Sequence, residues 1–220
     1  MTQREGVARL TRVAKPTASS GLMPPLRPGA KPPGAPTRRS LEAPTGVAKL
    51  TPKAAAVEEA ARELRRVMGR FATGVTVVTT TERDTIHGMT ANAFLSVSLR
   101  PPLVLVSLGR CRMNEMLPRT QRYGVSVLSH DQEHLAAHFA GQRASPVEPK
   151  FFWERGIPLL DTSLAHLVCR VVDYHPAGDH MLWIGEVEHL DHRDGAPLLF
   201  FTGRFGTLAE VQERADHPGK

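Results

Sequence analysis

The chain has 220 residues, 41% of them hydrophobic, and no run of about 18 apolar residues or apolar secretory leader, which predicts one sizeable soluble domain without a membrane segment. Its two cysteines, Cys111 and Cys169, match no metal-site or disulfide spacing, so we expect a reducing, cytoplasmic setting. The net charge of +6 arises in the first 57 residues, which hold ten Lys or Arg and two Asp or Glu, so the near-neutral remainder is not expected to bind nucleic acid.

Residues 1–57 also contain nine of the 18 prolines and no aromatic residue, a composition that predicts a disordered, basic tail. This tail, with a short sequence echo at 7–11 and 47–51, leaves several interpretations open: chance, a docking peptide, an organelle-targeting peptide, or a mis-assigned start codon. A tether to nucleic acid or to an acidic partner is a further interpretation. We expect residues 58–210 to form the folded domain and 211–220 a second tail.

The first half of the domain begins with a helix over 57–71, in which apolar residues recur at helical spacing. A β-branched run predicts a strand at 75–81, with a hairpin partner at 86–91. A buried strand follows at 103–108, and 113–117 predicts one helical turn that Pro118 stops.

The second half begins with a strand at 123–128 and a helix to about Ala140, in which Ser129 and Gln132 have capping-box spacing. A loop to Leu160 and three further strands, near 165–174, 181–190 and 196–201, complete the prediction. Many strands and few short helices predict a mainly β fold, an antiparallel β-barrel.

Histidines invite a search for a metal site. His130, His134 and His138 are spaced i, i+4 and i+8, but the His-Glu-x-x-His pattern is absent, which favours a solvated helix face and no metal. Neither cysteine has a nucleophile signature, and there is no Gly-x-Ser-x-Gly elbow.

The segment 88–98 combines small and hydroxyl-bearing residues between two strands. Such residues allow a flat ring to approach the backbone, and Thr90 and Asn92 offer hydrogen bonds to it. The same residues are also common in an ordinary turn, so composition alone leaves both interpretations open.

From about Glu63 to Leu208 the chain resembles the short-chain flavin reductases that supply reduced flavin to two-component monooxygenases. The matching blocks are Phe71–Thr80, Gly88–Asn92, Ser96–Val104, Gly124–Ser129 with Gln132 and Phe139, Gly178–His180, and Pro197–Phe201 with Gly203 and Arg204. The resemblance implies an FMN-binding split-barrel homodimer, with FMN or FAD bound near the dimer interface.

The resemblance also implies roles for individual residues. His180 matches the family histidine near the nicotinamide. The expected cofactor-binding residues are Ile86, His87, Gly88, Met89, Thr90, Asn92, Ala93, Ser107, Leu108, Gly109, Arg112, His138 and Phe139. Arg110-Cys111-Arg112-Met113 departs from the family pattern of a Ser or Thr and an Arg, so either Arg110 or Arg112 is expected to hold the flavin phosphate.

The implied activity is hydride transfer from NADH or NADPH to FMN or FAD, with the reduced flavin passing to a partner monooxygenase. The alternative is a non-catalytic protein on the same barrel that holds flavin, or another flat ligand, without turnover. A substitution of His180 separates the two, because only the enzyme needs the nicotinamide contact.

Overall fold

The computed structural model describes residues 52–83, 85–142 and 148–208, so most of the predicted N-terminal tail and all of the C-terminal tail lie outside the described residues. Helix α1 (Pro52–Met68) forms a unit distinct from the residues after it. It begins five residues before the predicted start, with proline in the first turn, where the missing N–H costs nothing. Ion pairs such as Arg62–Glu59 and Arg66–Glu63 follow its surface.

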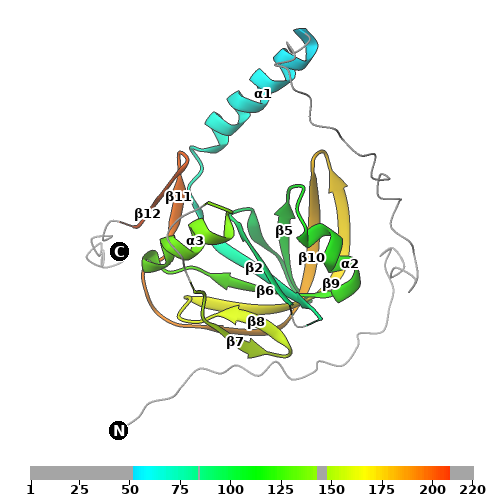
Figure 1. Ribbon diagram of the computed structural model, residues 1–220, viewed down its shortest axis with the longest axis vertical. Coiled ribbons are helices and arrows are strands. Elements are labelled where there is room, and N and C mark those ends of the chain that lie inside the picture. Colours follow the sequence, from blue (N-terminus) through cyan, green and yellow to red (C-terminus); the bar gives the residue numbers. More distant parts are fainter. Residues whose placement is uncertain (1–51, 84, 143–147, 209–220) are drawn as a thin grey trace, which may run out of the picture. The chain divides into compact units, whose positions relative to one another are not determined.

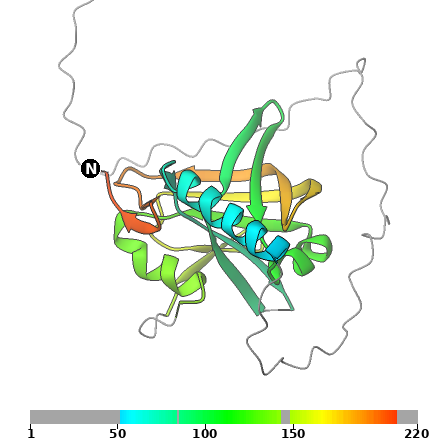
Figure 2. The ribbon, with the colours of Figure 1, turned by 90° about the horizontal axis from the view of Figure 1, so that it is seen from above.

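The main body from Gly69 is built on one seven-stranded antiparallel sheet (Figures 1 and 2). In pairing order its strands are β3 (Thr85–Ala91), β2 (Thr76–Glu82), β6 (Arg122–Val127), β9 (Ala165–Ala177), β10 (His180–His192), β5 (Pro102–Leu108) and β4 (Phe94–Leu99). The predicted strands of this sheet are confirmed, but β4 was not predicted, because its serines obscure the apolar alternation.

The sheet curls into a barrel because its two edges are consecutive in the chain. Strand β3 lies at one edge and β4 at the other, and only Asn92 and Ala93 separate them. The Ser107 amide donates a hydrogen bond to the Ala93 carbonyl over 2.9 Å, which fastens this link to β5. The β4–β5 hairpin extends beyond the barrel wall (Figure 2). The mainly β fold predicted from the sequence is confirmed.

Two smaller sheets complete the body. One pairs β1 (Thr73–Gly74), β11 (Leu199–Phe201) and β12 (Arg204–Gly206). The other is a hairpin of β7 (Phe151–Glu154) and β8 (Ile157–Leu160), so the prediction of a loop up to Leu160 was wrong. Arg155 and Gly156 join these strands with φ of 50° and 76°, the left-handed values of a two-residue hairpin turn.

Short helices flank the sheet. Helix α2 (Met113–Thr120) continues through Pro118, so the predicted stop there was wrong. Burial of Met113, Met116 and Leu117 stabilises the helix despite one lost backbone bond, and Gln121 ends it in the left-handed conformation. A 3-10 turn, η1 (His130–Gln132), leads into α3 (Glu133–Phe139).

The predicted capping box at the start of η1 is present. The Gln132 Oε1 atom accepts a hydrogen bond from the Ser129 amide over 3.1 Å. Gln132 Nε2 also donates to the Asp161 carbonyl over 2.9 Å, so the same buried amide ties this cap to the end of β8.

The barrel interior is filled by apolar side chains from every wall strand. Trp183 and Tyr123 are the largest of the fully buried side chains, and Val106, Val125 and Leu108 pack in the same cluster. A second cluster, around Val77, Leu135 and Leu198, lies beneath α3.

Glycine at position 185 is required by this packing. A Cβ atom there would lie 2.8 Å from Tyr123 Cζ and 2.9 Å from Cys169 Cβ, and closer still to the tyrosine hydroxyl. We expect Gly185→Ala to lower the free energy of unfolding by about 2–3 kcal/mol, the cost of overpacking a filled core. Gly206→Ala is the control, because no atom lies within 4 Å of its Cβ position. Urea unfolding measures both variants, and equal stability of the two would contradict the packing.

Candidate active site

Strand β3 supplies most of the predicted site residues and has one free edge in the described part of the chain, since only β2 pairs with it. Its side chains divide between two faces. Gly88 and Thr90 face α3, whereas Met89 and Ala91 pack against the barrel core. A single planar ligand therefore cannot meet all these side chains, but the backbone groups along the free edge are available to it.

The α3 side of β3 is shaped by Gly88 and Phe139. A Cβ on Gly88 would lie 2.7 Å from Phe139 Cε1, so only glycine allows the ring to approach this closely. The ring meets His138 edge-on at 4.9 Å between centroids, and Phe151 at 6.3 Å. Two residues predicted together, Phe139 and Gly88, are thus in contact, and exposed His138 stands beside them.

Thr90 connects β3 to α3 directly. Its Oγ1 donates a hydrogen bond to the Ala136 carbonyl over 2.7 Å, so the hydroxyl retains only acceptor capacity for a ligand. The predicted hydrogen bond between Thr90 and a bound ring stays a prediction, with the Oγ1 proton already engaged in this bond.

The link from β3 to β4 brings Asn92 and Ala93 beside the end of β5. Both residues are exposed, and Ser107 next to them is half-buried. Leu108 is 1% exposed within the core cluster, so only its backbone can serve a ligand. Ile86 and His87 lie further along β3 and are half-buried.

Gly109 and His180 meet at the open end of the β5–β10 pair. Their neighbours Leu108 and Met181 are register partners, and a Cβ on Gly109 would lie 3.5 Å from His180 Nε2. His180 Nδ1 is 2.7 Å from Asp179 Oδ1. This bond, with the nearby charge of Arg110, lowers the pKa of Asp179, so the carboxylate stays ionised and orients the imidazole with Nε2 toward Gly109.

Asn114, which was not predicted from the sequence, anchors the segment after Gly109. Its Nδ2 donates to the Gly109 carbonyl over 2.7 Å, and its Oδ1 accepts from Trp183 Nε1 over 2.8 Å. An asparagine in a short helix gives no pattern that indicates this role, since Trp183 lies 69 positions away.

Arg112 contributes positive charge beside β3. Burial, and then repulsion from Arg112, lower the pKa of His87. Within the described residues neither Arg110 nor Arg112 forms an ion pair with a carboxylate within 4.0 Å. Two guanidinium groups in the segment that leads into α2 are suited to an anion such as a phosphate.

The lowered pKa of His87 predicts a pH effect. His87 is harder to protonate in the folded chain than in the unfolded one, so lowering the pH through the unfolded value of 6.5 favours unfolding. We expect the NMR titration midpoint of His87 to lie below the unfolded value of 6.5, and to rise in an Arg112→Gln variant. An unchanged midpoint in that variant would contradict the proximity of Arg112.

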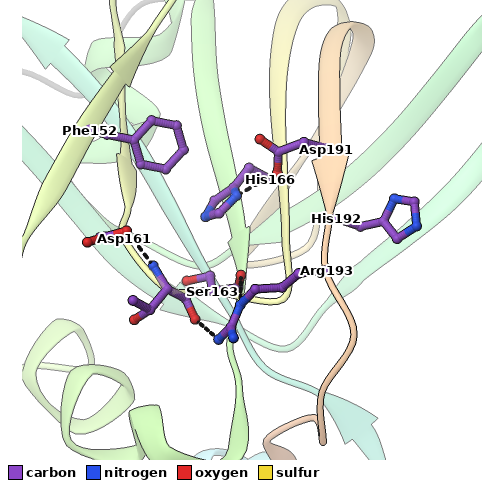
Figure 3. A pocket seen from close by; sticks show the side chains of 8 residues that line it. Phe152, Asp161, Ser163, His166, Asp191, His192 and Arg193 are labelled. Carbon is purple, nitrogen blue, oxygen red and sulfur yellow. Dashed lines mark hydrogen bonds and ion pairs between the residues drawn. The ribbon is translucent and has the colours of Figure 1, made fainter. Parts of the chain in front are cut away.

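A separate cavity of about 300 Å³ lies between the end of β8 and the end of β10 (Figure 3). His166 contacts Asp191 Oδ1 through Nδ1 and the Leu160 carbonyl through Nε2, both over 2.7 Å, while Arg193 donates to the Ser163 and Thr162 carbonyls. These bonds tie three strand ends together. The cavity includes none of the predicted site residues.

The described residues contain neither a metal-binding cluster nor a membrane-spanning helix. No group of three or more His, Cys, Asp or Glu side chains there is placed to hold a metal ion, and His130, His134 and His138 are exposed. No described helix combines the length and apolar character needed to cross a membrane.

Comparison with known proteins places this barrel in a class. Residues 68–209 match the model of the flavin reductase like domain. The fold is that of the solved flavin reductase PheA2 in its native state (TM-score 0.66, 48% identity, covering 68% of this chain and 98% of that one). It is also that of NADH:FAD oxidoreductase SgcE6 from Streptomyces globisporus C-1027, in complex with NAD and FAD fragments (TM-score 0.65, 37% identity, covering 70% and 96%).

Sequence relatives agree. An NADH-dependent flavin reductase from Rhodococcus sp is 54% identical over 149 residues (66% of this chain, 85% of the relative). FMN reductase (NADH) SmoA from Agrobacterium fabrum is 41% identical over 155 residues (69% and 88%). HsaB, the reductase subunit of a flavin-dependent monooxygenase from Mycobacterium tuberculosis, is 35% identical over 155 residues (66% and 80%). This chain belongs to the flavin reductase family, which confirms the resemblance inferred from the sequence.

Proposed function

We propose that this chain uses NADH to reduce FMN or FAD and passes the reduced flavin to a partner monooxygenase. One observation carries the proposal: the free edge of β3, the Gly109–Arg112 segment and His180 converge around the end of β5. The relatives named above, which include an NADH-dependent flavin reductase and a monooxygenase reductase subunit, support both halves of it.

The residues present fit a flavin. The isoalloxazine ring needs a flat surface and hydrogen-bonding groups at its rim, and β3 offers unpaired backbone groups along an edge with glycine at position 88. The phosphate needs positive charge, which Arg110 and Arg112 supply next to backbone amides. Asn92 and Ala93, which follow β3, are exposed to solvent.

In this arrangement a bound flavin supplies the acceptor for the nicotinamide hydride. The protein contributes position and electrostatics. Phe139 and Gly88 border the ring face, the Gly109–Arg112 segment holds the phosphate end, and His180 orients the nicotinamide through Nε2. Asp179 fixes the orientation of that imidazole.

We propose further that the protein acts as a homodimer. Edge strand β4 exposes Leu95, Val97 and Leu99, the last at 84% of its surface, and exposed apolar side chains on an edge strand are typical of a protein interface. Light scattering coupled to gel filtration measures the mass. A dimer that a Leu95→Lys, Leu99→Lys double variant converts to monomer supports the proposal, and a wild-type monomer overturns it.

Steady-state NADH oxidation with each pair of FMN or FAD and NADH or NADPH tests the proposed activity. We expect oxidation that depends on added flavin and saturates with it, and a preference for NADH. Absence of flavin-dependent oxidation with all four pairs would overturn the proposal. Transfer of reduced flavin to a partner is tested separately. The measurement is product formation by a flavin-dependent monooxygenase that receives its reduced flavin only from this protein.

A further inference from the structure

We infer that Asn114 is a positioning residue, which holds the Gly109–Arg112 segment in the geometry that binds the flavin phosphate. The inference rests on the proposed flavin site and adds a residue outside it. Asn114 does not touch the ligand in this account. It acts through the backbone of Gly109.

The chemistry of its two partners fixes the orientation of the Asn114 amide. The Trp183 indole N–H can only donate, so it must face Oδ1, and the Gly109 carbonyl can only accept, so it must face Nδ2. Both bonds are short, at 2.8 and 2.7 Å. If the side-chain amide were flipped, Nδ2 would face the Trp183 N–H, donor against donor, and Oδ1 would face the Gly109 carbonyl, acceptor against acceptor. Only one orientation of the amide therefore satisfies both partners.

The anchor behind Asn114 is rigid. Trp183 is 1% exposed within the barrel core and packs against Tyr174, with 4.9 Å between the ring centroids and 31° between the ring planes. Through its two hydrogen bonds, Asn114 therefore ties Gly109, which follows β5, to Trp183 in strand β10.

The segment itself has only three residues between Gly109 and α2. The backbone N–H of Asn114 donates to the Cys111 carbonyl over 3.2 Å, and the backbone N–H of Glu115 donates to the Arg112 carbonyl over 3.0 Å. With the side-chain bond to Gly109, position 114 holds the segment at Gly109 and at Cys111, while the Glu115 amide holds its last residue, Arg112. Loss of that bond frees the N-terminal end, and with it the backbone and guanidinium groups that face the phosphate.

The test separates the phosphate end from the ring end by comparing FMN with riboflavin, which has no phosphate. Fluorescence quenching gives the two dissociation constants without turnover. In Asn114→Leu, a neutral variant of similar size, we expect FMN to bind about tenfold more weakly, the effect of losing one buried hydrogen bond, and riboflavin to bind within about twofold of wild type. The kcat at saturating FMN should change little.

Gln121→Leu is the matched control. It removes a side-chain amide that donates to the Pro118 carbonyl at the other end of the same helix, and it should leave both affinities unchanged. Asn114→Ser, which leaves room for a water on Trp183 Nε1, is the second variant in case the leucine impairs folding, and the same FMN-specific loss is expected.

Equal losses for FMN and riboflavin, or no loss in either variant, would overturn the inference. Wild-type binding that does not distinguish FMN from riboflavin would overturn it as well, while flavin reduction itself could stand. Failure of the proposed function has a different signature, because the wild type would then bind neither flavin or would fail to oxidise NADH with any flavin.

Discussion

Replacing His180 with alanine is expected to lower kcat/KM for NADH at least about tenfold, while the dissociation constant of the flavin stays within about twofold of wild type. The imidazole is 46% exposed, is oriented by Asp179, and stands over Gly109, so its removal costs the core little packing. Stopped-flow reduction by NADH and flavin fluorescence quenching measure the two quantities.

His175→Ala is the matched control for this prediction. His175 lies on the same hairpin, in β9, and its Nε2 is 2.9 Å from Asp173, an exposed His–Asp pair much like that at 179 and 180. The His175→Ala variant should reduce flavin at the wild-type rate. Equal losses in the two variants would show that the hairpin, and not the position of His180, matters.

The second large effect is expected at Gly88. A methyl group there would lie within 2.8 Å of two Phe139 ring atoms, closer than real Cβ contacts come, so the ring must move. Because Phe139 borders the proposed ring face, we expect Gly88→Ala to weaken flavin binding about tenfold or more. Phe139→Leu in the same chain should restore part of that affinity, since it removes the clashing ring atoms.

Gly74→Ala is the control for the substitution type, since no atom lies within 4 Å of its Cβ position. Flavin titrations of Gly88→Ala, of Phe139→Leu and of the double variant complete the double-mutant cycle. Wild-type affinity in Gly88→Ala would place the flavin away from Phe139 and contradict the site.

Much of the barrel follows from local sequence. The β-branched run in β2 and the apolar run in β5 are each determined by residues within one strand, and the Ser129–Gln132 cap is a three-residue pattern. The candidate site was predicted from the order of family blocks, since residues 86–93, Gly109 and His180 are distant in sequence. The barrel places Ala93 beside Ser107 and His180 beside Gly109, and the assignment of these residues to a flavin stays a prediction.

The missed features depend on contacts that no local pattern contains. Strand β4 pairs with β5 through a bulge at Ser96–Ser98, and its mixed side chains do not alternate cleanly. Helix α2 keeps Pro118 because buried methionines outweigh a lost bond. The β7–β8 hairpin is different, since its Arg155-Gly156 turn between apolar runs was a usable signal.

Some residues near the candidate site make structural contacts that the sequence did not predict. The Thr90 hydroxyl is bound to α3 and the Leu108 side chain is in the core, so contact of these two side chains with a flavin stays a prediction that their structural roles restrict. Asn114, which no motif indicated, connects the core to Gly109 through both ends of its side-chain amide.

The central claim, hydride transfer to a bound flavin, is tested most directly by one anaerobic measurement. The protein and one equivalent of FMN or FAD are mixed with NADH, and the absorbance of oxidised flavin near 450 nm is followed. This account predicts rapid bleaching with one NADH consumed per flavin, much slower in His180→Ala. Flavin that binds but stays oxidised, at the rate seen without protein, would contradict it and identify the barrel as a non-catalytic flavin-binding protein.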